Sequence, residues 1–170
     1  MSLPPLYLGI DPGLGGALAC VQPGSDVDPK PHISVHDMPT FTITVNQKPR
    51  RQLDLVKVNE LFDRMDGLVT HAGIEEPHAL PGQGVTSAFS FGFVCGVLQM
   101  VCAAYRIPVT LVRPATWKAQ MRLTADKDAC RKRASQLFPT AAELWARKQD
   151  DGRAEAVLLA WWGLRGAGML

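Results

Sequence analysis

The chain has 170 residues, of which 46% are hydrophobic, and a net charge of +2. This length and hydrophobic content fit one domain over residues 1–170, and the small charge excludes a polycation that binds nucleic acid through bulk charge alone. The four cysteines have no CxxC spacing, which is typical of reduced thiols in a cytoplasmic protein. We see no secretion signal and no apolar run of about 18 residues, so we expect no membrane partner.

The N-terminal part contains three short apolar runs that predict strands, over residues 6–11, 16–22 and 32–38. The first run ends at Asp11, directly before Pro12-Gly13, and the second reads as its hairpin partner. Residues 39–51 are polar, end in KPRR and carry few helix signals, so we expect an exposed and mobile loop there.

The pattern changes at Leu53, where apolar residues begin to recur at helical spacing up to a stop at Gly67. Two further strands are predicted over residues 68–74 and 108–113. Helices are expected over residues 86–105, 114–121 (or a turn), 126–138 and 150–164. Strands first and alternation later predict an α/β domain, with a mixed sheet covered by helices on both faces.

Acidic residues stand at places where a ligand site is expected. Asp11 and Glu75 each end an apolar strand, and ligand sites of α/β sheets gather at such strand ends. Asp151 and Glu155 are four residues apart, so they share one face of the last helix. Taken singly, Asp11 has an alternative as a turn residue, Glu75 as a solvated strand end, and Asp150 or Asp151 as a helix cap.

Carboxylates that converge repel each other, and a divalent cation is the usual remedy. A ligand set of oxygen atoms favours Mg²⁺ or Mn²⁺ over zinc. Two such ions about 4 Å apart clamp the attacking and leaving oxygens of a phosphodiester. The sequence therefore points to metal-dependent phosphodiester chemistry.

Several motifs, in their order along the chain, resemble the RuvC family of Holliday-junction resolvases, in the ribonuclease H-like superfamily. They are GIDPG at 9–13, IEE at 74–76, SAFSFGFVCGVL at 87–98, PATWK at 114–118, ADK at 125–127 and DDGRAEA at 150–156. The spelling DGRAEA and the short chain resemble phage-type members. The resemblance implies a mixed five-stranded sheet of order 3-2-1-4-5, flanked by helices.

The resemblance also implies a set of metal ligands, namely Asp11, Glu75, Asp151 and Glu155, with two Mg²⁺ ions that Mn²⁺ can replace. One departure from the bacterial pattern affects this set. In the bacterial pattern the last two ligands are three residues apart, whereas here the residue three before Glu155 is Gly152. We therefore assign Asp151, four before, and keep Asp150 in reserve.

Five further residues are expected to contact DNA: Lys118, Lys127, His78, Arg50 and Arg51. The two lysines match basic positions that the family places near the scissile phosphate or the DNA backbone. His78 falls where the bacterial enzyme stacks a phenylalanine at the junction centre, and an imidazole also stacks on bases. Each of the five has an alternative as a solvated surface residue. Phe89, Phe91 and Phe93 favour helix packing or a dimer face over a base-stacking platform.

The expected function is a Mg²⁺-dependent endonuclease that acts as a homodimer and resolves four-way DNA junctions, leaving a 5′-phosphate and a 3′-hydroxyl. Two symmetric cuts need two sites related by a two-fold axis. Alternatives are a nuclease of forks and flaps, a branched-DNA binding module that does not cut, and a nuclease of ribosomal RNA precursors. A nucleotide-hydrolysing actin-like protein normally needs two such domains, so we expect no nucleotide cofactor.

Overall fold

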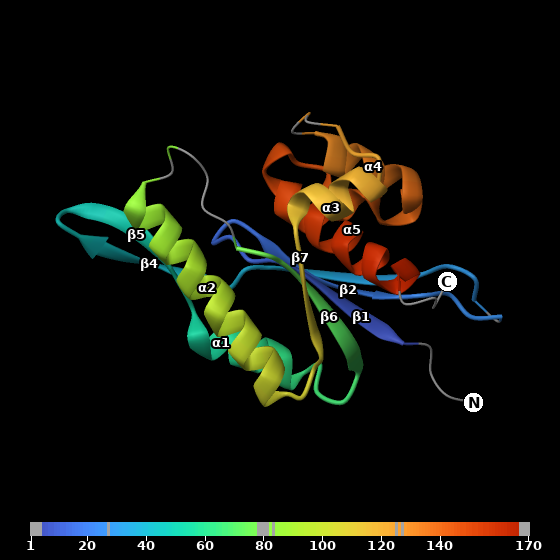
Figure 1. The fold of residues 1–170 in the computed structure, drawn as a ribbon, viewed down its shortest axis with the longest axis horizontal. Helices are drawn as coiled ribbons and strands as arrows, with labels where there is room; N and C mark the ends of the chain where they lie inside the picture. Colours follow the sequence, from blue (N-terminus) through green and yellow to red (C-terminus); the bar gives the residue numbers. More distant parts are fainter. Residues whose placement is uncertain are drawn as a thin grey trace.

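The computed structural model describes residues 5–26, 28–77, 82, 84–124, 126 and 128–166. Its centre is a five-stranded sheet of order β3-β2-β1-β6-β7 (Figure 1). The strands are β1 (Leu6–Asp11), β2 (Ala17–Gln22), β3 (His32–Asp37), β6 (Val69–Glu75) and β7 (Val109–Val112). The first three are antiparallel neighbours, while β6 and β7 run parallel to β1. The expected order 3-2-1-4-5 is confirmed, with β6 and β7 as its fourth and fifth strands.

Helices cover both faces of the sheet (Figure 1). One face carries α1 (Leu55–Asp63) and α2 (Val85–Ala104), and the other carries α5 (Asp151–Gly166). The shorter helices α3 (Pro114–Gln120) and α4 (Ala129–Leu137) lie beside α5. Side chains of β1 alternate between two cores, because successive strand residues point to opposite faces: Leu8 and Ile10 join the α1–α2 core, and Tyr7 joins the α5 core.

Helix α5 packs directly on β1 because β1 has a glycine at the contact. A Cβ built on Gly9 would lie 2.0 Å from the carbonyl oxygen of Ala156 and 2.6 Å from the backbone nitrogen of Ala160. Only a glycine leaves room for this backbone approach. The contact fixes the N-terminal half of α5, which carries Glu155, against the strand that ends in Asp11.

The expectation of a mobile loop over residues 39–51 is wrong. The segment forms a separate hairpin of β4 (Thr40–Val45) and β5 (Lys48–Leu53), which extends away from the main sheet (Figure 1). Its two-residue turn holds Asn46 and Gln47 at φ of 50° and 60°, the left-handed conformation that suits tight hairpins. The β-branched residues of TFTITV favour a strand, while Pro49 and the charges of β5 hide its partner.

Smaller differences lie around the C-terminal helices. Helix α4 begins at Ala129 rather than at residue 126. Two 3₁₀ segments that the sequence does not predict, η1 (Pro139–Trp145) and η2 (Lys148–Asp150), connect it to α5. Trp145 is buried and its Nε1 donates a hydrogen bond of 2.9 Å to Ser135 Oγ. The buried, hydrogen-bonded Trp145 side chain explains why this segment is ordered although its sequence lacks helical periodicity.

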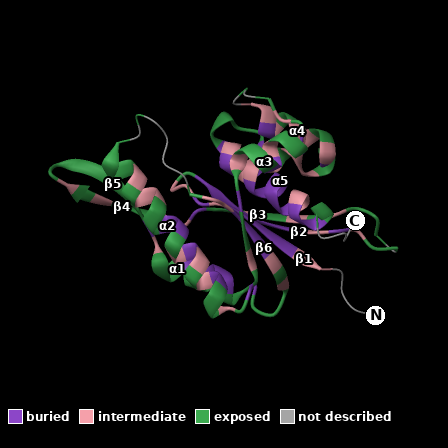
Figure 2. Ribbon diagram, in the orientation of Figure 1, coloured by how far each residue is buried: buried purple, intermediate pink, exposed green. Residues whose placement is uncertain are grey.

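Helix α2 corrects the expectation that no apolar run reaches the length of a membrane span. Its 20 residues have a mean hydropathy of 1.7 and pass that test by length and composition alone, a test that core helices also pass. The helix lies on the sheet with its outer side open (Figure 2). Phe89 is 78% exposed and Phe93 is 51% exposed, so neither packs into the core of this chain. Of the interpretations above, packing within this chain is therefore wrong for these two residues.

Candidate active site

Asp11 stands at the end of β1, where a glycine turn leads back into β2. The backbone N–H of Gly13 donates to Asp11 Oδ1 at 3.3 Å, and the N–H of Gly16 closes the turn on the carbonyl oxygen of Gly13 at 2.8 Å. A Cβ on Gly16 would lie 2.2 Å from the carbonyl oxygen of Asp11. The turn therefore needs this glycine, and it holds the Asp11 carboxylate partly buried at the edge of the sheet.

Glu75 stands beside Asp11 because their strands are parallel neighbours in register, with Ile10 paired to Ile74. The indole Nε1 of Trp117 donates a hydrogen bond of 2.9 Å to Glu75 Oε1. Trp117 is fully buried in α3, so this contact fixes the carboxylate from a rigid element. The next residue, Glu76, pairs instead with Arg113 at 3.0 Å. Of the two adjacent glutamates, Glu75 is therefore the one that joins the site.

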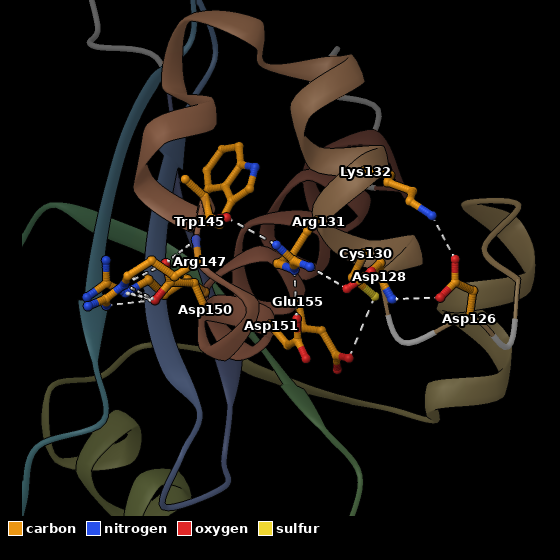
Figure 3. Close-up of polar contacts among 12 residues, drawn as sticks. Asp126, Asp128, Cys130, Arg131, Lys132, Trp145, Arg147, Asp150, Asp151 and Glu155 are labelled. Atoms are coloured by element: carbon orange, nitrogen blue, oxygen red, sulfur yellow. Dashed lines mark hydrogen bonds and ion pairs between the residues drawn. The ribbon is translucent and has the colours of Figure 1, made fainter.

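Lys118 connects Glu75 with Glu155 of α5. Its Nζ lies 3.0 Å from Glu155 Oε2 and 3.7 Å from Glu75 Oε1. On the other side of the glutamate, the Cys130 thiol donates to Glu155 Oε1 at 3.6 Å (Figure 3). A charge within the apolar stretch AEAVLLAWWG thus faces other polar groups rather than open solvent.

The electrostatics show that three carboxylates share one region. Burial, together with the negative charges of Glu155 and Glu75, raises the pKa of Asp11 to about 7, although the Gly13 hydrogen bond and Lys118 act to lower it. Burial lowers the pKa of Lys118, but Glu155 and Glu75 outweigh that effect and the net shift is upward. Burial, together with Glu155, raises the pKa of Cys130 to about 12, so its thiol is protonated at neutral pH.

The acids at the start of α5 have other partners. Asp151 Oδ1 lies 2.9 Å from Arg131 Nε, and Arg131 also pairs with Asp128, the residue directly before α4 (Figure 3). Asp150 is buried and accepts hydrogen bonds from the Arg147 side chain, at 2.8 Å from Nη2, and from its backbone N–H. Asp150 is therefore a capping residue of η2, bound to Arg147 rather than to Lys118.

The position that faces Asp11 is Gly152. A Cβ there would lie 2.8 Å from Asp11 Oδ2 and 2.8 Å from the Cα of Gly16. The residue three before Glu155 thus points at the site, as the bacterial spacing implies, but has no side chain. The structure brings together Asp11, Glu75, Glu155 and Lys118, and directs Asp151 to Arg131.

Oxygen donors dominate this cluster and suit a hard divalent cation. Within the described residues, no three of the His, Cys, Asp and Glu side chains are placed so that they hold one ion together. The Lys118 ammonium lies between two of the carboxylates and supplies the positive charge there.

The expected DNA contacts are distributed over several elements. Lys118 lies in the site, whereas Lys127 and His78 fall outside the described residues. Arg50 is exposed on β5. Arg51 is exposed too, but its Nη2 donates to the carbonyl oxygen of Leu14 and to Thr40 Oγ1, which ties the hairpin to the turn after Asp11.

Sequence reasoning missed three residues that contact the predicted ligands: Trp117, Cys130 and Arg131. Trp117 lies inside the PATWK motif next to Lys118, so a signal for it was present. Cys130 and Arg131 carry no such signal, because one isolated cysteine and one arginine in a basic helix are typical of many helices.

The ordered strands, the carboxylates at their ends and the helix that carries Glu155 define the ribonuclease H-like fold, in its RuvC-like form. Two solved structures are similar to this chain. One is Thermus thermophilus RuvC in complex with Holliday junction substrate, with a TM-score of 0.59, 17% identity, and coverage of 97% of this chain and 96% of that chain. The other is a Thermus thermophilus RuvC structure, also with a TM-score of 0.59 and 17% identity, covering 95% and 96%. No protein-family model and no curated protein sequence matches the chain.

Proposed function

We propose that this protein is a divalent-metal-dependent endonuclease that resolves four-way DNA junctions by paired, symmetric nicks. The observation that carries the proposal is the meeting of Asp11, Glu75 and Glu155, from three separate elements, around the Lys118 ammonium. Its setting in a RuvC-like fold supports DNA as the substrate. The proposed setting is the cytoplasm.

Asp11, Glu75 and Glu155 would hold two Mg²⁺ or Mn²⁺ ions, with Asp151 joining them when it leaves Arg131. Bound ions of this kind supply an activated water and neutralise charge that develops on a phosphate. The chain's own groups do the positioning. Trp117 holds Glu75 by a hydrogen bond, Cys130 holds Glu155, and the turn at Gly13 holds Asp11.

Lys118 has a second role in this proposal. Once it leaves the carboxylates, its ammonium is a compact charge suited to a non-bridging phosphate oxygen. Lys127, His78, Arg50 and Arg51 are proposed to contact the junction arms. Arg50 and Arg51 lie on a defined hairpin, so they present their charges at a fixed place relative to the site.

The outer face of α2 is proposed to hold a second copy of the chain. Phe89, Phe93 and Met100 are exposed there, and a groove of 520 Å³ runs between α2 and α1. Gly92 and Gly96 lie on this face with open space where a Cβ would stand, so another helix can approach closely. Two-fold pairing gives the two sites that symmetric nicking needs.

A charge on this face tests the pairing. Phe93→Glu should turn a dimer into a monomer in sedimentation equilibrium, while Leu111→Glu, at an exposed apolar residue of β7, should leave the dimer intact. A wild-type monomer at all concentrations would remove the dimer from the proposal.

The deciding experiment is cleavage of a labelled synthetic four-way junction beside a fork, a flap and a linear duplex, with Mg²⁺, with Mn²⁺ and with chelator. Paired symmetric nicks on the junction alone, dependent on metal, are expected. Equal cutting of forks and flaps identifies a broader debranching nuclease. Binding without any cutting identifies a binding module and overturns the nuclease proposal.

A further inference from the structure

A polar pocket of 440 Å³ borders the turn after Asp11, on the side of β3 and the hairpin. Gly15 and Gly16 of the turn form one wall, Thr40 and Arg51 of the hairpin a second, and Arg147 and Gln149 of the η2 segment a third. Asp37, Met38 and Asp150 complete it. Lys118 and Trp117, which reach the site from α3, do not line it. The pocket therefore lies next to Asp11 but apart from the glutamates that Lys118 bridges.

Both acids of this pocket are already neutralised. Asp37 accepts two hydrogen bonds of 2.6 Å from Arg153, which hold its pKa below the ordinary value. Asp150 is held by Arg147 in the same way (Figure 3). Arg51 makes no ion pair within the described part of the chain. Three arginines thus meet two aspartates, and the pocket keeps one positive charge.

Unused donors line the same pocket. Arg51 uses its Nη2 on Leu14 and Thr40, and its Nε and Nη1 make no hydrogen bond to any described residue. Arg147 binds Asp150 through Nε and Nη2, which leaves Nη1, on a side chain that is 60% exposed. The exposed Gln149 amide adds further donors. Guanidinium groups present planar pairs of N–H donors that match the oxygens of a phosphate.

The turn connects this pocket with the candidate active site. Gly16 touches both Asp11 and Gly152, so the backbone that holds the Asp11 carboxylate is also a wall of the pocket. If a nucleic-acid strand places one phosphate at Asp11 and Lys118, the strand passes this turn on one side of that phosphate. The pocket then offers unused positive donors on the β3 side.

We propose that this pocket binds a backbone phosphate of the strand that is cut, beside the scissile one. The inference rests on the proposed function, which supplies the strand, and adds a subsite to it. Arg51 and Arg147 bind the phosphate from two sides, with Gln149 at the rim. The strand therefore crosses the sheet edge from Lys118 over Asp11 to the base of the hairpin.

Gln149 gives the sharpest test, because it is exposed and its side chain has no hydrogen-bond partner among the described residues. Gln149→Glu places a negative charge at the rim, and Gln149→Lys a positive one. Gln136→Glu and Gln136→Lys are matched controls, on an exposed glutamine at the far end of α4. All four are made in full-length Asp11→Asn protein, and binding to a four-way junction is measured with chelator over about 50 to 200 mM salt.

Gln149→Glu should weaken junction binding about tenfold, and Gln149→Lys should strengthen it several-fold, with the Gln136 variants near the parent protein. Arg51→Gln should lower the slope of log affinity against log salt by about one, the loss of one phosphate contact. Equal effects at positions 149 and 136 overturn the subsite, because they report bulk charge only. The subsite is also overturned if inorganic phosphate shifts the Gln149 amide NMR signals but the Gln149 variants bind the junction with unchanged affinity.

The outcomes separate the subsite from the function. Wild-type protein that cuts the junction while Gln149 variants bind like the controls overturns the subsite alone. Wild-type protein that neither binds nor cuts the junction overturns both.

Discussion

Gly152 lies so close to Asp11 that a Cβ at position 152 would stand 2.8 Å from Asp11 Oδ2. Heavy atoms do not approach that closely without displacement, so the Asp11 carboxylate and a side chain at 152 exclude each other in this packing. The sequence shows this position as a departure from the bacterial pattern, which has a ligand there. The structure gives the departure a physical meaning, since the missing side chain leaves room for Asp11.

Gly152→Ala tests that relationship. The methyl group should push Asp11 or α5 out of place, so cleavage should fall at least about tenfold and the protein should lose about 1 to 3 kcal/mol of stability through overpacking. Gly166→Ala, on the same helix with open space around its Cβ, is the control and should change neither quantity. Junction cleavage and urea unfolding measure the two effects. If Gly152→Ala cut the junction at the wild-type rate, the close contact between position 152 and Asp11 would not matter for activity.

Asp11→Asn should abolish cutting, keep junction binding and stabilise the metal-free protein in a pH-dependent way. The folded pKa is about 7, whereas an unfolded aspartate has a pKa of about 3.9. Between these values the folded state holds a proton that the unfolded state has released, so the wild type loses stability as pH rises through this window. Asparagine never ionises, so the extra stability of Asp11→Asn over the wild type should be absent below about pH 4 and complete above about pH 8.

Urea unfolding with chelator measures this difference, which should reach about 4 kcal/mol at pH 8, the free energy that corresponds to the gap between the two pKa values. Asp66→Asn, in an exposed turn after α1, is the control variant. If the stability difference between Asp11→Asn and the wild type did not change with pH, ionisation of the Asp11 carboxylate would not be what destabilises the folded protein.

Much of this architecture can be predicted from sequence because its signals are local. The apolar runs of β1 and β6 end at Asp11 and Glu75, and parallel pairing then places the two acids together. The hairpin at 40–53 could not be predicted, because Pro49 and the charges of β5 break the strand pattern and only pairing with β4 compensates. The partners of Asp151 and Asp150 also depend on tertiary contacts, with Arg131 twenty residues away and η2 defined by its own cap.

Lys118→Met should separate metal binding from cutting. The ammonium now pairs with Glu75 and Glu155, so its removal takes one positive charge away from both carboxylates and should tighten Mn²⁺ binding about tenfold. Cutting should nevertheless fall, since the same ammonium is proposed to bind the phosphate. Titration of Mn²⁺ by electron paramagnetic resonance gives the affinity without any turnover. Lys57→Met, at an exposed lysine of α1, is the control, and weaker Mn²⁺ binding by Lys118→Met would contradict the competition.

The last prediction concerns the ion pair between Asp151 and Arg131, which joins α4 to the start of α5. Arg131→Gln frees the carboxylate, whereas Asp151→Asn removes it, so the two variants break the same pair with opposite consequences for a metal. If Asp151 turns to the metal, as proposed, Asp151→Asn should reduce cutting at least about a hundredfold, the scale of a lost ligand partner. Arg131→Gln should then cut at a rate near the wild type.

Both variants should lose stability, and Arg131→Gln should lose more of it, because Arg131 also pairs with Asp128. Normal cutting in both variants would assign Asp151 to the α4–α5 contact alone. The metal site would then consist of Asp11, Glu75 and Glu155, with the space at Gly152 taken by Asp11 itself.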